Sequence, residues 1–134
     1  MEYKSAHGVE LEIDSTRRAE VKKRFADSPV KLLGLATDER LDWIDPEKLK
    51  QAIEKGKRYV QLSHDVGAHG IRVFPIDFHK EVSQEQTIAQ IARSLNELGK
   101  FAAEYGQLIR IENHGTAGRL TTFLRLPCHA RAAG

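Results

Sequence analysis

Several large classes of protein are excluded by what this sequence lacks. Its 134 residues contain one cysteine, Cys128, which rules out a disulfide framework and a cysteine-based zinc site and fits a reducing compartment. No run approaches the roughly 18 apolar residues of a membrane span, and the first residues, MEYKSAHGVE, do not form a signal peptide. We therefore expect a cytoplasmic protein that does not associate with membranes.

The sequence also lacks a large excess of positive or negative charge. Lys and Arg number 21 against 19 Asp and Glu, so the formal net charge is only +2 and gives no general argument for nucleic-acid binding. Gly115 and Gly118, in HGTAGR, match neither a P-loop nor a dinucleotide fingerprint. What remains is an ordinary globular composition, with 40% hydrophobic and 30% charged residues. Its length suits one domain of about 100–150 residues.

Hydrophobic patterning and capping residues predict alternating strands and helices. Strands are expected over residues 8–14, 30–36, 70–75 and 108–113. Ser15 is expected to cap a helix over residues 16–26, and Asp45-Pro46 opens a second helix that stops near Gly67. Ser83 and Gln86 form a capping box for a third, which ends near Gly106. Residues 120–126 are expected to begin a further helix.

This order predicts a parallel sheet with right-handed helical crossovers. One face of the strands is apolar, whereas the other carries charges, among them Glu10, Glu12, Arg72, Arg110 and Glu112. Such a sheet is typical of a barrel wall with a polar interior. A small α/β layer whose polar face meets solvent explains the pattern equally well.

Three segments in order resemble the xylose isomerase-like TIM-barrel family, which includes sugar phosphate isomerases and epimerases and is related to endonuclease IV. They are GIRVFP, IARSLNELGKFAAEYGQ and LIRIENHG, within a resemblance over residues 6–122. A complete barrel has eight strands in about 250 residues. The resemblance therefore implies an α/β fold with parallel strands, a (βα)4 half of a TIM barrel that covers strands two to five. We expect a half-barrel domain at residues 1–122 and an irregular tail at 123–134.

The resemblance also implies a divalent metal ion, Mn, Mg, Zn or Co, that polarises sugar oxygens during proton transfer between carbons. Glu112 matches the family's metal-binding glutamate at the carboxyl end of a strand, where TIM-barrel sites lie. His114 is the expected second ligand, and we assign both residues a catalytic role. The alternative for Glu112 is an ion pair with Arg110 or Arg72.

Substrate contacts are expected around the same barrel end, with a small sugar or sugar phosphate as the ligand. The residues assigned to it are Trp43, Arg72, Asp77, His79 and Asn113. Thr37, Asp38 and Glu39 are expected in the loop before Trp43. The alternatives are a solvated loop for Asp77 and His79 and a hydrophobic lid for Trp43. His7, His64 and His69 are expected at the opposite end, in structural roles.

An open half-barrel exposes two strand edges and one sheet face, which invites pairing with another chain. The simplest closure is a homodimer in which two sets of four strands restore eight. Three functions then compete: a metal-dependent sugar isomerase or epimerase, a non-catalytic half-barrel that self-associates, and a DNA repair protein like endonuclease IV. The last is the weakest, because the charge is nearly balanced and the extra histidine ligands have no match here.

Overall fold

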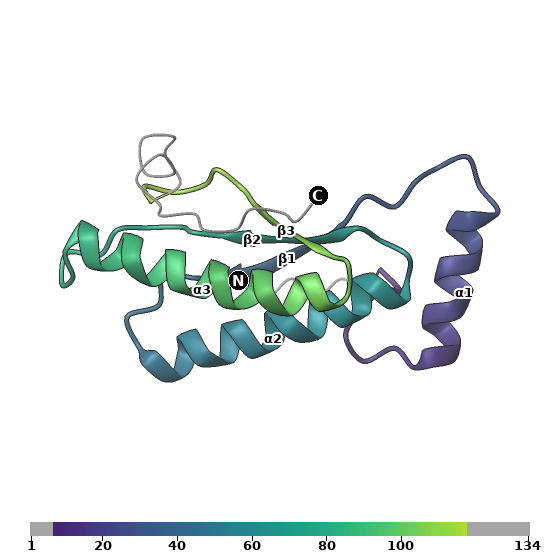
Figure 1. Ribbon diagram of the computed structural model, residues 1–134, viewed down its shortest axis with the longest axis horizontal. Helices are drawn as coiled ribbons and strands as arrows, with labels where there is room; N and C mark the ends of the chain where they lie inside the picture. The colour runs from purple at the N-terminus through teal and green to yellow at the C-terminus, as the bar shows by residue number, and fades with distance from the viewer. Residues whose placement is uncertain (1–6, 118–134) are drawn as a thin grey trace.

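The computed structural model describes residues 7–117, which form an α/β layer. The elements follow in the order α1 (Ser15–Ala26), β1 (Leu35–Arg40), α2 (Pro46–Asp65), β2 (Gly70–Phe74), α3 (Gln84–Glu104) and β3 (Leu108–Ile111). Helices α2 and α3 lie side by side under the sheet, whereas α1 stands at one end (Figure 1). None of the helices in this range is long and apolar enough to cross a bilayer.

The sheet is parallel throughout, with the strand order β1-β2-β3. Each strand follows its neighbour through a helix, as a parallel connection requires. Gly70 starts β2 so close to β3 that an added Cβ would lie 2.0 Å from the carbonyl oxygen of Leu108. The α/β half-barrel fold predicted from the sequence is confirmed.

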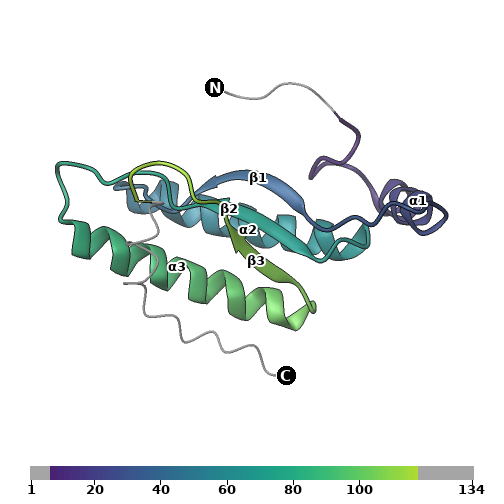
Figure 2. The same cartoon turned by 90° about the horizontal axis from the view of Figure 1, so that it is seen from above.

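Only one face of this sheet is covered by helices. Helix α2 packs against β1 and β2, and α3 packs against β3 (Figure 2). Ile71 and Val73 point into this interface and are fully buried, together with Val60 of α2 and Leu98 of α3. On the other face, β3 carries the exposed side chains of Leu108 and Arg110. No helix packs on that open face within residues 7–117.

The predicted helix ends are confirmed where capping chemistry marked them. The Asp45 carboxylate accepts hydrogen bonds from the backbone N–H groups of Glu47 (2.9 Å) and Lys48 (3.4 Å), with Pro46 as the first helical residue. Ser83 and Gln86 form a reciprocal capping box at the start of α3. These bonds satisfy donors that a helix start leaves free.

The strand predicted over residues 8–14 is wrong. The Glu10 carboxylate accepts hydrogen bonds from the backbone of His7 and Gly8 and so turns the chain locally. The apolar side chains of the segment pack in a small second cluster, in which Leu11 is buried against α1 and the end of α2. Asp14, rather than Ser15, caps α1. The described residues therefore form three strands instead of four. The predicted closed dimer was based on four strands from each of two chains, and this number is not found.

The next strand lies later in the chain than its apolar run predicted. β1 covers Leu35–Arg40, whereas Val30 and Leu33 of the predicted strand are exposed. Thr37, Asp38 and Glu39, expected in a loop, are therefore strand residues. β3 ends at Ile111, two residues before its predicted end, although the Glu112 N–H still donates to the Val73 carbonyl oxygen (3.1 Å). The helix predicted from residue 120 and the tail at 123–134 lie outside the described residues.

Replacing Leu98 with Ala tests the core between α2 and α3. The side chain is fully buried and approaches Gly56 of α2, so its truncation leaves a cavity and should cost about 3 kcal/mol of unfolding free energy. Urea denaturation followed by circular dichroism measures the loss. Leu33→Ala, at an exposed leucine, is the matched control and should change stability by less than about 0.5 kcal/mol. Equal losses in both variants would contradict this core.

Candidate functional site

The candidate site is at the carboxyl ends of the strands, where Arg72 connects all three. Its Nη2 donates to the Thr37 carbonyl oxygen of β1 (3.1 Å), and its Nη1 forms an ion pair with Glu112, next to the end of β3. The Thr37 hydroxyl donates in return to the Arg72 carbonyl oxygen (2.8 Å). Arg72 also lies over the Phe74 ring, 4.3 Å from its centroid. An ion pair between Arg72 and Glu112 was one of the alternatives expected from the sequence, and the structure contains it.

Glu112 and His114 lie together, as two ligands of one metal ion would. The Nδ1 atom of His114 is 3.6 Å from Oε1 of Glu112, a separation that two ligands about 2.1 Å from a shared cation can span. The other oxygen of Glu112 pairs with Arg72. Residues 7–117 contain no group of three or more His, Cys, Asp or Glu side chains able to hold a metal. The pair would supply two ligands of a metal site, and residues 7–117 do not supply a third.

A second cluster, formed by Arg40, Asp42 and His79, lies between the loops after β1 and β2. The Asp42 side chain is fully buried, and both its oxygens accept from Arg40, at 3.0 Å from Nε and 2.7 Å from Nη2. Nε2 of His79 lies 2.8 Å from the same carboxylate. Sequence reasoning expected His79 at this end but missed Asp42 and Arg40. The available signal was the position of Asp42 two residues after β1, between Leu41 and Trp43.

Asp77 joins the loop after β2 to the loop after β3. Hydrogen bonds from the Thr116 backbone N–H (2.9 Å) and hydroxyl (3.1 Å) hold the pKa of Asp77 below its usual value. Gly115 has a positive φ of 72°, and a Cβ there would lie 2.0 Å from the carbonyl oxygen of Ile76. Asp77 is thus used to hold two loops together at the mouth.

The other predicted substrate residues differ in how tightly they are held. Trp43 is half-buried, with the cationic groups of Arg40 and Lys48 5.0 and 5.1 Å from its ring. Its carbonyl oxygen accepts a 2.9 Å hydrogen bond from Gln90 of α3, which fixes it above the helix layer. Asn113 is exposed and forms no hydrogen bond with the described residues. His64, at the end of α2, and His69, before β2, lie at the amino ends of the strands, away from these groups.

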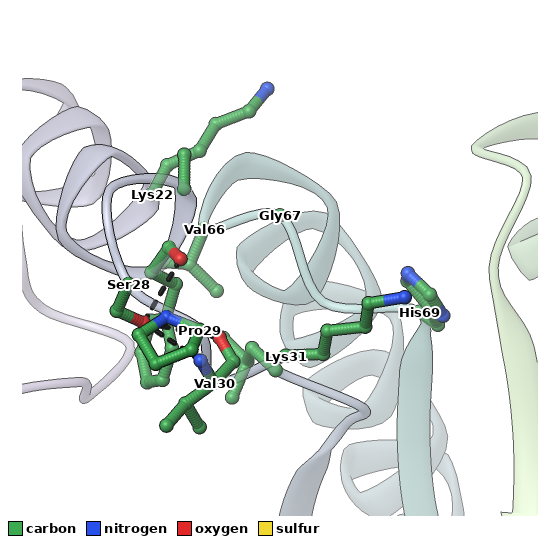
Figure 3. Close-up of a pocket in the computed structure, with 11 residues that line it drawn as sticks. Lys22, Ser28, Pro29, Val30, Lys31, Val66, Gly67 and His69 are labelled. Carbon is green, nitrogen blue, oxygen red and sulfur yellow. Dashed lines mark hydrogen bonds between the residues drawn. The ribbon is translucent and has the colours of Figure 1, made fainter.

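A cavity of about 460 Å³ lies at that opposite end of the sheet (Figure 3). Its walls come from the end of α1, the approach to β1 and the turn between α2 and β2. The Lys22 side chain lies against Gly67, where an added Cβ would be 3.2 Å from its Cγ atom, and in Figure 3 Lys31 extends toward His69. The carboxyl ends of α1 and α2 both lie here, together with the basic side chains of Lys22 and Lys31. The cavity is separate from the candidate site.

One buried charge secures β1 to the helix layer. Glu39 is 5% exposed, and its carboxylate lies 2.8 Å from the ammonium group of Lys55 on α2. Loss of hydration raises the pKa of Glu39, while the Lys55 charge opposes this shift. The exposed carboxylate of Asp38 also reaches Lys55, at 3.4 Å.

Parallel strands, helices on one face and polar groups at the carboxyl ends define a segment of a TIM-type α/β barrel. The sequence profile of the xylose isomerase-like TIM barrel family matches residues 3–128, and the chain belongs to this family. A similar solved structure is 3-keto-D-glucoside 4-epimerase, YcjR, from E. coli, in its apo form, with a TM-score of 0.63 and 18% sequence identity. The match covers 72% of this chain and 41% of the epimerase, so the chain spans less than half of that protein. No curated protein matches the sequence.

Removing the countercharge of Glu39 should make stability depend on pH. Lys55→Met leaves a buried carboxylate unpaired and should lower the unfolding free energy by about 2 kcal/mol near pH 7, less than for a fully buried pair because Lys55 is half-exposed. The folded pKa of Glu39 is raised, so the folded chain binds this proton more readily than the unfolded chain. Lowering the pH through the window above the ordinary value of about 4.3 should therefore restore stability.

Urea denaturation at a series of pH values measures this recovery. Lys57→Met is the control, because Lys57 pairs with the exposed carboxylates of Glu54 and Glu97. Its loss should be below about 1 kcal/mol at every pH. A deficit in Lys55→Met that grows as the pH falls would contradict the assignment.

Proposed function

We propose that this chain forms part of a metal-dependent sugar isomerase or epimerase and acts on a small sugar or sugar phosphate in the cytoplasm. The observation that carries the proposal is the Glu112–His114 pair at the carboxyl end of a strand in a chain of this family. The solved structure of similar fold, a 3-keto-D-glucoside 4-epimerase, supports this reaction class and a sugar as the substrate.

The described residues suggest a division of roles. Glu112 and His114 would hold a divalent ion, of which Mn, Mg, Zn and Co are the candidates, and the ion would polarise adjacent sugar oxygens. Arg72 keeps the Glu112 carboxylate oriented on the open face, and Trp43 offers a ring surface to a sugar. Asp77 and His79 line the loop after β2, and Asn113 presents an exposed amide beside the metal ligands.

Metal binding by Glu112 is the first test. Titration of the purified chain with Mn²⁺, followed by water-proton relaxation, and with Zn²⁺, followed by calorimetry, should show saturable binding. Glu112→Gln should weaken it at least about tenfold, because it replaces an anionic ligand with a neutral amide of the same shape. Glu104→Gln, at an exposed glutamate of α3, is the matched control and should bind like the parent chain.

Equal affinity in the Glu112 and Glu104 variants would contradict the proposed metal site. It would favour the second candidate, a non-catalytic half-barrel. The specific observation behind this alternative is the ion pair between Glu112 and Arg72, which already satisfies one carboxylate oxygen with a cation from the same chain. Nothing comparable favours a role in DNA repair.

We also propose that a second copy of the chain covers the open sheet face. Leu108 is 55% exposed there, and Arg110 next to it forms no ion pair with any described residue. β1 and β3 each pair with β2 alone in the described sheet, so each offers one free edge. Free edges and an uncovered apolar side chain favour association, and a second copy supplies the same surface.

The solution mass checks this association. Light scattering on a size-exclusion column should give about twice the 15.1 kDa mass of the chain. Leu108→Asp should shift the mass toward the monomer, because it places a charge on the covered face. Leu33→Asp, an exposed leucine before β1, should leave the dimer intact. A monomeric parent chain would contradict the proposal.

A further inference from the structure

The Arg40, Asp42 and His79 cluster is the most strongly built polar group outside the Glu112–His114 pair. Asp42 has no side-chain exposure, yet it is a carboxylate. Burial of such a group is costly unless hydrogen bonds compensate it. Four donors do so: Nε and Nη2 of Arg40, the ring of His79 and the backbone N–H of Asp77, at 3.3 Å.

These bonds select the tautomer of the neutral His79 ring. A carboxylate held by the Arg40 fork accepts hydrogen bonds only, so Nε2 of His79 has to carry a hydrogen. In the neutral ring Nδ1 is then an acceptor. Nδ1 has no partner in the part of the chain that the structure describes, and the His79 side chain is 30% exposed. The ring therefore reaches the surface with a free acceptor nitrogen.

The cluster also lies at the right end of the sheet. Arg40 is the last residue of β1, and His79 is in the loop after β2. Asp77, in the same loop, is hydrogen-bonded to Thr116, two residues beyond the proposed metal ligand His114. The loops that hold both groups are thus bonded to one another.

We propose that His79 accepts a proton from a hydroxyl group of the bound sugar, and that Asp42 and Arg40 are its positioning residues. This inference rests on the proposed sugar-binding function. In the step, the sugar O–H bond breaks, an Nδ1–H bond forms on His79, and the electron pair stays on the sugar oxygen. The resulting imidazolium remains next to the Asp42 carboxylate, and the proton returns to oxygen when the step reverses.

The tautomer of His79 tests the positioning. Nitrogen-15 imidazole spectra of the whole chain, assigned with His79→Gln, should show neutral His79 protonated at Nε2. Asp42→Ala removes the acceptor that faces Nε2, so a fraction of the neutral His79 ring should carry its hydrogen at Nδ1 instead. Asp38→Ala, at an exposed strand position, should leave the tautomer unchanged.

A sugar titration separates a functional role from a structural one. D-fructose should shift both the Nδ1 resonance of His79 and the ring resonances of His114 in the parent chain. Asp42→Ala should weaken the His79 shift. His79→Gln, which does not depend on Asp42→Ala remaining folded, should weaken D-fructose binding read at His114 about fivefold, the value of one hydrogen bond of about 1 kcal/mol.

The outcomes distinguish this inference from the proposed function. If D-fructose shifts His114 but not His79, or if His79 is protonated at Nδ1 in the parent chain, the role of His79 is overturned and the proposed function stands. If D-fructose shifts neither ring, both are overturned. An unchanged tautomer in a folded Asp42→Ala chain overturns the role of Asp42.

Discussion

The guanidinium of Arg72 holds the open face of the sheet together, and the candidate site depends on it. On the covered face, Ile71 and Val73 are packed by two helices. On the other face no helix of the described chain supplies packing, and a single side chain spans the three strands through Thr37, its own backbone and Glu112. Among residues 7–117 its buried Nε atom has no hydrogen-bond partner, so this connection is made at some energetic cost. The same contact that orders the strands thereby sets the orientation of the Glu112 carboxylate.

Glu112 therefore has two roles, one in holding the strands together through Arg72 and one in the candidate metal site. A metal ion and Arg72 both favour a carboxylate, and each can hold one of its oxygens. His114 lies beside the oxygen that Arg72 does not use. The geometry thus leaves one oxygen and one imidazole facing the same region, which is why the pair remains a candidate although the ion pair has formed. A complete ligand set has to include donors that residues 7–117 do not supply.

Sequence reasoning was accurate where a local signal had a single physical meaning. Asp45-Pro46 and the capping box at Ser83 each satisfy specific helix donors, and the structure places α2 and α3 accordingly. Alternation over residues 8–14 had two meanings, because a loop that inserts Leu11 into a cluster shows the same pattern as a strand. The prediction of β1 made the opposite error, because it placed a true strand residue, Glu39, in a loop. Glu39 is buried in β1 because Lys55, sixteen positions later, neutralises its charge. The Asp42 cluster was missed for a similar reason, since two of its donors, His79 and the backbone of Asp77, come from the loop after β2, 37 and 35 positions later.

The mouth of this half-barrel is held by bonds within the described chain. The Ala117 N–H donates to the Ile76 carbonyl oxygen (2.9 Å), Ala117 is buried, and Asp77 bonds to both Thr116 and Asp42. The loops after all three strands are therefore fixed to one another before any further wall of a barrel is added. Rigid placement of a few polar groups is what a binding site needs from its scaffold. Glu112 and His79 are accordingly held by contacts within residues 7–117.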